Sequence, residues 1–397
     1  MGYSSVRGSL KAIEHAENLI ASAIHAGGNP VKLEQVLDQL PAAVEKAMAE
    51  GAIYDPFLGA LAVRQAQGDT IEAAFLLRAY RTTLPRLGYS MPSQSRDMRV
   101  LRRVSATFKD VPGGQVLGQT RDYTQRLLDF TLADGTKTAV PGTRSADSAT
   151  APGSPTSSGD ADDDDPRPIP LVIDHLRKDG LLAPAPAAPL EREPFDVTRT
   201  PLLFPAPRSA RLQVLARGES GGMLSLAYGA LRGYGASHAY VAEVRSGDMP
   251  VEISHPLTGR RARIGWLPVT ECHSVNPGHG DLGGESLFDM SFGYGITIGH
   301  EERRAISMAV IEESLTGKNG LGDQAVENDE YVLHHIDCVE ATGFVEHLKL
   351  PHYVTFQSSL QRTRKFGELV RAARAKERDH TGKAHAHTNG AEGRTGG

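Results

Sequence analysis

The sequence is poor in cysteine and tryptophan. Two cysteines and one tryptophan occur among 397 residues. Two cysteines cannot build the dense disulfide framework of a small secreted domain. We therefore expect a protein of the reducing cytoplasm whose stability comes from a hydrophobic core.

Long apolar runs and an excess of basic residues are also missing. No stretch approaches the ~18 apolar residues of a membrane-spanning helix. Lysine and arginine number 43 against 48 aspartate and glutamate residues, which gives a net charge of −5. These numbers argue against a membrane protein and against a nucleic-acid-binding protein.

Helical patterns dominate the first third of the chain. One helix is predicted by apolar residues spaced three and four positions apart. These residues are Ile13, Ala16, Ile20 and Ile24. Pro41 separates two further short helices. Asp69 is placed to cap another helix, which ends before Pro85.

The composition changes in the middle of the chain. The stretch "GTRSADSATAPGSPTSSGDADDDDPRPIP" is rich in Ser, Gly, Pro and Asp and has few apolar residues. Such a segment cannot bury enough surface to order itself. "LVIDHLRKDGLL" predicts one short helix before a linker of alternating alanine and proline. We predict a low-complexity insertion and linker over residues 133–192.

Strand patterns follow. "VEIS" and "ARIGWL" predict two strands joined by the hairpin loop "HPLTGR". "GYGITIGHEERRAISMAVIEESLTG" predicts a short strand and then a helix that ends near Gly317. The predicted fold class is α+β. Its parts are a mainly helical domain over 1–132, the insertion, a mixed α/β domain with short strands and glycine-rich turns over 193–371, and a disordered tail over 372–397.

Two arginine-rich places could bind phosphate. Arg102 and Arg103 precede the flexible turn "VPGGQVLG", and a basic cluster beside a glycine turn can hold a phosphate group. The alternative is a solvated helix face followed by a tight turn. "FDVTRTPLLFPAPRSARL" carries Arg199, Arg208 and Arg211, which form either a second phosphate clamp or ordinary surface charge.

A third place combines arginine, glycine and histidine. In "LRGYGASHAY", Arg232 and the backbone of Gly233 and Gly235 could cradle an anion. His238 follows at once and is a candidate general acid or base. A histidine after a glycine turn can equally be an ordinary polar residue.

The segment "HLKLPHY" contains the candidate metal ligands His347 and His352. Zinc is bound by neutral imidazole and takes three or four protein ligands. A spacing of five does not stack two residues on one helix face, and Pro351 indicates a bend between them. Other candidate ligands nearby are His334, His335 and Cys338. The alternative is a pair of packed polar side chains without a metal.

Several longer segments carry a more specific signal. They are "AFLLRAYRTTL", "KDVPGGQVLGQTRDYTQRLLDFTL", "DVTRTP", "LARGESG", "LAYGALRGYGASH", "VTECHSVN" and "GFVEHLKLPHYVTFQ". Together, and in this order, they resemble subunit I of the bacterial carbon–phosphorus lyase core complex. The resemblance covers most of the chain. The stretch 135–165 and the C-terminal tail depart from it, and neither holds an expected functional residue.

The resemblance implies the opening step of phosphonate breakdown. In this family, adenine is displaced from MgATP by an alkylphosphonate oxygen, which gives α-D-ribose 1-alkylphosphonate 5-triphosphate. The subunit alone is expected to act as a purine nucleoside triphosphate nucleosidase. Mg²⁺ is the expected cofactor with ATP. The expected partners are subunits G, H and J and the ATP-binding-cassette-type subunits K and L.

The resemblance also implies a role for the histidine pair. His347 and His352 match ligands of a zinc ion that the family shares with subunit J, a radical S-adenosylmethionine protein. One alternative remains a scaffold that supplies zinc ligands and an interface while catalysis resides elsewhere. A weaker one is a zinc hydrolase with its full ligand set in this chain.

Overall fold

The structure is a computed structural model. It describes residues 9–26, 28–120, 122, 127–128, 130, 133, 169–185, 194–234, 239–277, 290–317, 322 and 324–389. The chain forms two compact units, residues 1–339 and 340–397. Among the described residues, no helix is long and apolar enough to cross a membrane.

The N-terminal part of the first unit is helical, as predicted. Its helices are α1 (Ser9–Ala26), α2 (Leu33–Gln39), α3 (Pro41–Gly51), α4 (Pro56–Gln65) and α5 (Thr70–Arg81). The predicted cap of α5 is confirmed, because Asp69 accepts hydrogen bonds from the N–H groups of Ile71 and Glu72. Helices α2 to α5 enclose one hydrophobic core around Val44 and Leu77.

Helix α1 forms as predicted, but its apolar face stays exposed. Ile13, Ile20 and Ile24 are 51%, 58% and 53% exposed. The spacing of apolar residues indicates a helix and a common face. It does not indicate what that face packs against.

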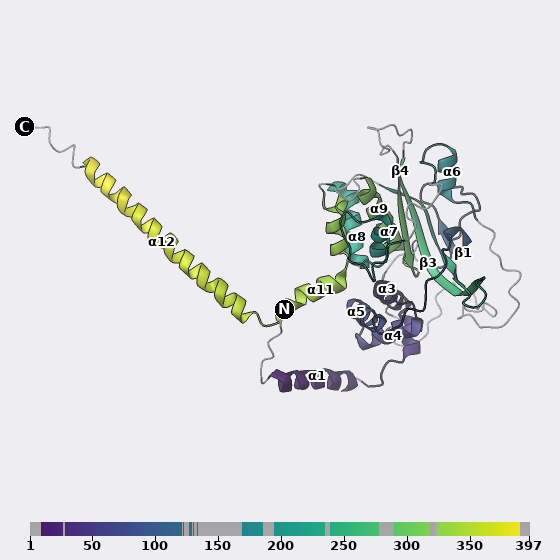
Figure 1. The fold of residues 1–397 in the computed structure, drawn as a ribbon, viewed down its shortest axis with the longest axis horizontal. Helices are drawn as coiled ribbons and strands as arrows, with labels where there is room; N and C mark the ends of the chain where they lie inside the picture. The colour runs from purple at the N-terminus through teal and green to yellow at the C-terminus, as the bar shows by residue number, and fades with distance from the viewer. Residues whose placement is uncertain are drawn as a thin grey trace, which may run out of the picture. The chain divides into compact units, whose positions relative to one another are not determined.

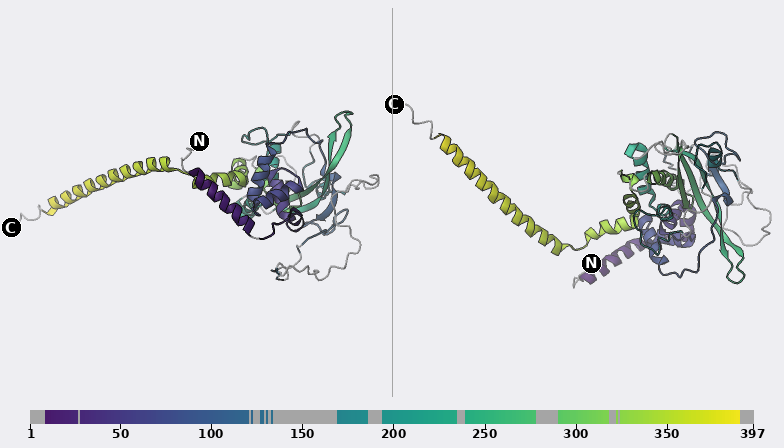
Figure 2. Two further views of the ribbon diagram at one scale, coloured as in Figure 1. Left: turned by 90° about the horizontal axis from the view of Figure 1, so that it is seen from below. Right: turned by 45° about the horizontal axis from the view of Figure 1, so that its top comes forward.

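A four-stranded antiparallel sheet lies at the centre of the first unit (Figure 1). Its strands, in spatial order, are β1 (Arg99–Val104), β2 (Tyr240–Ser254), β3 (Arg261–Pro277) and β4 (Met290–Ile298). The predicted hairpin is confirmed: β2 and β3 pair up to Ser254 and Arg261. Its end is exposed and projects away from the helices (Figure 2).

Strand β1 corrects one expectation. Arg102 and Arg103 do not lie on a solvated helix face, because the segment pairs with β2 as a strand, with Arg103 opposite Arg245. The β-branched residues Val100 and Val104 favour this extended conformation. A short 3₁₀ turn, η1 (Ser95–Asp97), leads into the strand.

One face of the sheet is covered by α9 (Glu302–Gly317). Val244 and Cys272 of the sheet pack there against Ala305 and Ala309 of the helix. Around α9 lie α7 (Arg208–Ala216), α8 (Ser220–Gly229) and the π-helical turn η3 (Ala230–Tyr234), as Figure 1 shows. The predicted strand–helix succession of β4 and α9 is thus confirmed.

The opposite face is partly covered by α6 (Val172–Lys178), the short helix predicted within the low-complexity region. Val172 and Ile173 share a small core with Ala242 and Val275 of the sheet. The first unit continues through η4 (Ala325–Glu327) and α10 (Asp329–His335). Helix α11 (Cys338–Glu346) crosses the boundary between the units.

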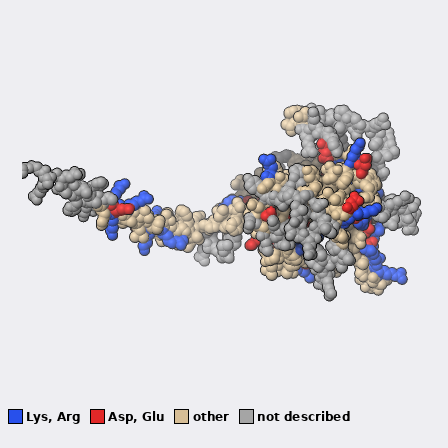
Figure 3. Space-filling model, turned by 90° about the horizontal axis from the view of Figure 1, so that it is seen from above, with Lys and Arg blue, Asp and Glu red and all other residues tan. Residues whose placement is uncertain are grey.

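The second unit consists of the end of α11, the 3₁₀ turn η5 (His347–Lys349) and the long helix α12 (Tyr353–Asn389). Helix α12 corrects the expectation of a disordered tail for residues 372–389. The segment contains five alanines, two arginines and two lysines, residue types of high helix propensity. Lysine and arginine side chains gather along it (Figure 3).

Candidate functional site

The two histidines of "HLKLPHY" lie next to each other in the second unit. His347 begins η5 and His352 directly precedes α12, with Pro351 between them. The ring centroids are 5.2 Å apart and the rings are inclined by 59°. Two imidazoles on one tetrahedral zinc, with Zn–N bonds of ~2.0–2.1 Å, place their centroids about 5 Å apart. The observed separation therefore fits a shared ion.

Backbone carbonyl groups determine which nitrogen of each ring is available. Nδ1 of His347 contacts the carbonyl oxygen of Phe344, and Nδ1 of His352 lies 2.7 Å from that of Leu350. A carbonyl oxygen only accepts, so each Nδ1 carries the hydrogen and donates it. Each Nε2 then keeps its lone pair for a metal, the arrangement common to metal-binding histidines.

The other candidate ligands do not complete the set. Among the described residues, no group of three or more His, Cys, Asp or Glu is placed to hold a metal ion. His347 and His352 can therefore fill two positions of a tetrahedral ion, and the rest must come from outside the described chain.

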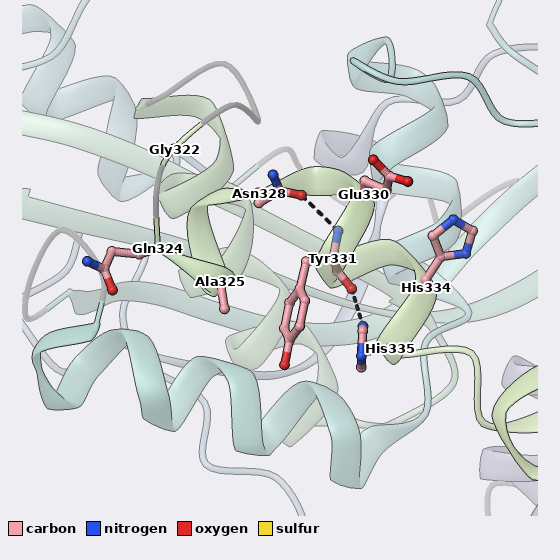
Figure 4. Close-up of a pocket in the computed structure, with 8 residues that line it drawn as sticks. All are labelled: Gly322, Gln324, Ala325, Asn328, Glu330, Tyr331, His334 and His335. Carbon is pink, nitrogen blue, oxygen red and sulfur yellow. Dashed lines mark hydrogen bonds between the residues drawn. The ribbon is translucent and has the colours of Figure 1, made fainter. Parts of the chain in front are cut away.

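His334 and His335 serve local contacts on α10. They border an open pocket of ≈ 500 Å³ and point in different directions (Figure 4). The ring of His335 stacks on Tyr331 at 4.0 Å, and the ring of His334 packs against Phe204. Their orientation explains why two adjacent histidines do not form a chelating pair.

Cys338 is held as a thiol. Its Sγ donates to a carboxylate oxygen of Glu219 at 3.6 Å. Burial and the charge of Glu219 raise the pKa of Cys338 to about 11. Because zinc binds the thiolate, this environment disfavours Cys338 as a ligand.

The arginines of β1 are engaged by the protein itself. Arg103 is buried, pairs with Glu243, and donates to the carbonyl oxygens of Pro112, Gly114 and Pro170. It therefore anchors the glycine turn. The neighbouring Arg102 pairs with two carboxylates and the Leu117 carbonyl oxygen. The carboxylates belong to Asp122 and Glu302.

The other predicted arginines lie in separate places. Arg208 on α7 pairs with Glu312 of α9, with 2.9 Å between Nε and Oε1, and Arg211 is buried on the same helix. Arg199 is exposed in the turn after Asp196. Arg232 is exposed in the middle of η3 and lies over the Tyr228 ring. The structure thus does not gather the predicted arginines into one site: two lie on β1, where neighbouring side chains point to opposite faces, and two lie on α7. His238 lies outside the described residues.

A buried polar network on the sheet was not predicted from the sequence. It occupies the face opposite α9 and draws on β2, β3 and β4. Its members are the buried side chains of Glu243, Arg245, Glu271 and His273 and the partly buried Tyr294. Alternation of polar and apolar residues in "VAEVRSG" and "VTECHSV" was the available signal.

Glu271 is the centre of this network. It pairs with Arg245, accepts a hydrogen bond from the Tyr294 hydroxyl at 3.0 Å, and has one oxygen 3.5 Å from Nε2 of His273. Burial opposes ionisation, but His273 and Arg245 outweigh it and hold the pKa of Glu271 well below its usual range. The site therefore keeps a buried carboxylate ionised.

His273 lies between two carboxylates. Besides Glu271, its Nδ1 is 3.9 Å from Oε2 of Glu243. Burial alone would lower the pKa of His273, but the two glutamates raise it above the usual histidine value. The group can hold a proton inside the sheet. Burial and Glu271 also raise the pKa of Tyr294, so its hydroxyl remains a donor.

Comparisons with known proteins cover most of the chain. Residues 2–369 match the family described as bacterial phosphonate metabolism protein (PhnI). The alpha-D-ribose 1-methylphosphonate 5-triphosphate synthase subunit PhnI of Rhizobium meliloti (strain 1021) is 42% identical over 381 residues, which is 95% of this chain and 98% of the relative. The protein of the same name from Escherichia coli (strain K12) is 43% identical over 369 residues, 90% of this chain and 96% of the relative. The chain therefore belongs to the bacterial phosphonate metabolism protein (PhnI) family.

Proposed function

We propose that the chain carries out the nucleotide-dependent first step of phosphonate breakdown. The observation that carries this proposal is the family match, together with two relatives named as subunits of a ribose 1-methylphosphonate 5-triphosphate synthase. In the proposed reaction, the bond between ribose C1′ and adenine breaks. A phosphonate oxygen forms the new bond to C1′, and adenine leaves with a proton.

The reaction makes three chemical demands. Positive charge develops on the sugar, as in glycoside hydrolysis. The leaving purine needs a proton, and His238 is our candidate donor. The triphosphate needs Mg²⁺ and cationic side chains. Arg102 and Arg103 already donate to carboxylates and carbonyl groups of the chain itself. Of the other arginines predicted for this task, Arg199 and Arg232 are exposed.

We assign the histidine pair to a zinc ion shared with a partner subunit. The rings of His347 and His352 lie at a suitable separation and keep Nε2 available, but they supply only two ligands. A zinc ion there would supply a four-coordinate Lewis-acidic centre joining the two proteins. The partner proposed from the family is the radical S-adenosylmethionine subunit J, and G, H, K and L are the other proposed companions.

A scaffold role is the second candidate. It is favoured by exposed apolar residues around the histidine pair, since Phe344, Tyr353 and Val354 are 72%, 73% and 86% exposed. Such side chains in one short segment are typical of a protein–protein interface.

Adenine release separates the two candidates. The purified chain is incubated with MgATP or MgGTP, and free purine is quantified by chromatography, with the reconstituted complex measured in parallel. Our proposal expects free purine from the chain alone, and phosphonate-dependent ribosyl transfer from the complex. Purine release by the remaining subunits without this chain would favour the scaffold role.

A further inference from the structure

Four arginines from separate segments meet beside the N-terminal helices. Arg78 and Arg81 lie on α5, Arg86 follows that helix, and Arg217 directly follows α7. The first three belong to one stretch of sequence, and Arg217 arrives from a distant one. The fold, rather than the local sequence, creates this cluster.

Two of the four arginines have carboxylate partners. Nη1 of Arg78 lies 2.7 and 2.8 Å from the two carboxylate oxygens of Asp337. Nη1 of Arg86 lies 2.5 Å from Oδ2 of Asp196, and its Nη2 donates to the Thr198 hydroxyl at 2.7 Å. These contacts hold the two side chains in place.

The side chains of the other two, Arg81 and Arg217, form no ion pair and no hydrogen bond with any residue that the structure describes. Both are half-buried. Four guanidinium groups thus stand beside two carboxylates, which leaves a net charge of +2 in one partly desolvated place. Like charges held together destabilise the folded chain unless an anion joins them.

The pKa shifts of Arg81 and Arg217 agree with a local excess of positive charge. Burial, followed by the charges of Arg78 and Arg86, lowers the pKa of Arg81. Burial, followed by Arg81 and Arg78, lowers the pKa of Arg217 to about 10. Both groups remain charged at neutral pH. Charged groups kept in an unfavourable environment are common at binding sites.

We propose that Arg81 and Arg217, together with the neighbouring Arg78 and Arg86, bind the phosphate chain of the nucleotide substrate. That the phosphate chain belongs to a nucleotide rests on the proposed function. The planar fork of arginine matches phosphate oxygens, and two unpaired forks suit a chain of several phosphates. Exposed Arg199 lies in the turn that begins at Asp196, the residue whose carboxylate pairs with Arg86.

A phosphonate group presents similar oxygens, so the test uses both anions. The full chain is titrated with inorganic tripolyphosphate or methylphosphonate, and binding is followed by calorimetry and by the melting temperature. We expect tripolyphosphate to bind and to raise the melting temperature, and methylphosphonate to do neither at the same concentration. Binding of methylphosphonate alone, through the same arginines, would overturn the phosphate-chain assignment.

Variants test the two unpaired arginines. Arg81→Gln and Arg217→Gln should each weaken tripolyphosphate binding at least tenfold. They should also leave the unliganded melting temperature unchanged or raise it, because they remove like-charge repulsion. A misfolded variant would instead melt at a lower temperature. An unchanged or raised melting temperature therefore shows that the weaker binding comes from the lost guanidinium group. Arg64→Gln, an exposed arginine of α4, is the matched control. Unaltered tripolyphosphate binding in both variants would refute the site.

Kinetics of the reconstituted complex distinguish this site from the proposed function. The KM for ATP should rise at least tenfold in either variant, with a smaller change in kcat. If the wild-type complex releases no adenine while tripolyphosphate binding still depends on Arg81 and Arg217, the proposed function fails and the anion site stands. If adenine is released with an unchanged KM in both variants, the nucleotide assignment of the site fails and the function stands.

Discussion

Glu50 of α3 and Arg304 of α9 form a buried ion pair, with 2.8 Å between Oε1 and Nη2. The pair connects the helices of the N-terminal core to the helix that covers the sheet. Nη2 of Arg304 also donates to the Ser220 hydroxyl at 3.0 Å, and Lys46 reaches Glu219 at 2.7 Å. Charged groups therefore hold together two parts whose hydrophobic cores are separate.

The first prediction concerns the pH dependence of stability. Burial raises the pKa of Glu50 from 4.5 to about 7, despite the opposing charges of Arg304 and Lys46. Between these values the folded chain binds more protons than the unfolded chain, so the free energy of unfolding falls as pH rises through this window. Glu50→Gln should reduce the difference in unfolding free energy between pH 5 and pH 8 by about 2–3 kcal/mol.

Urea denaturation at the two pH values measures this difference. Glu14→Gln changes an exposed carboxylate on α1 and should leave it unaltered. An equal pH dependence in wild type and Glu50→Gln would contradict the raised pKa.

The second prediction concerns the close approach of α9 to the sheet. A Cβ atom on Gly295 would lie 2.0 Å from the carbonyl oxygen of Ala305, and one on Gly293 would lie 2.1 Å from that of Ala309. Because backbone cannot move aside without separating helix and strand, Gly295→Ala should destabilise the chain by about 3 kcal/mol or more. Gly265→Ala on β3 meets no atom within 4 Å and is the control. Similar melting temperatures for the two variants would show that α9 packs less closely.

The third prediction concerns the buried network on the sheet. Glu271→Gln removes the closer charge partner of buried Arg245 and leaves only Glu243, whose Oε1 is 3.9 Å from Nε of Arg245. The change should cost about 3 kcal/mol of unfolding free energy. Tyr294→Phe removes one hydrogen bond and should cost only about 1–2 kcal/mol. Denaturant titrations measure both, with Tyr353→Phe, a 73% exposed tyrosine, as control. The reverse order of the two effects would mean that Glu271 is not the centre of the network.

The fourth prediction concerns zinc. The isolated chain should bind zinc weakly, and its complex with the radical S-adenosylmethionine subunit tightly, because the described chain supplies only two ligands. His347→Ala or His352→Ala should remove zinc from the complex and impair the later cleavage of the carbon–phosphorus bond, while purine release continues. Metal analysis after mild chelation measures the zinc content.

His380→Ala is the matched control, because His380 also faces a backbone carbonyl through Nδ1 but lies on α12, outside the segment of the pair. Stoichiometric zinc in the isolated chain that disappears in Cys338→Ala would contradict the shared site. Loss of purine release in well-folded His347→Ala and His352→Ala would instead place these histidines in the first reaction.

Much of the fold could be predicted from local patterns. The cap at Asp69, the break at Pro41 and the hairpin between Ser254 and Arg261 depend on residues a few positions apart. The secondary structure at Arg102 and Arg103 was harder to predict, because the pattern there suits a helix face as well as a strand. The segment is a strand because it pairs with β2.

The candidate sites also differ in whether their residues lie close together in the sequence. The histidine pair is visible in the sequence because five positions and one proline separate its members, and the structure brings the two rings within reach of one ion. The sheet network and the arginine cluster were missed. Their members come from strands and helices that are far apart in the chain.

The sequence by itself determined most of the secondary structure, the family and the pair of candidate metal ligands, because each depends on residues that are neighbours or form long characteristic segments. Only the tertiary structure decided which charges are neutralised. From the sequence, Arg103 was a candidate phosphate ligand. In the structure it pairs with Glu243 and donates hydrogen bonds to three carbonyl groups. Arg81 and Arg217 look unremarkable in the sequence, yet the fold places them together without a carboxylate of their own. Charge pairing acts through space, and spatial neighbours exist only once the chain has folded.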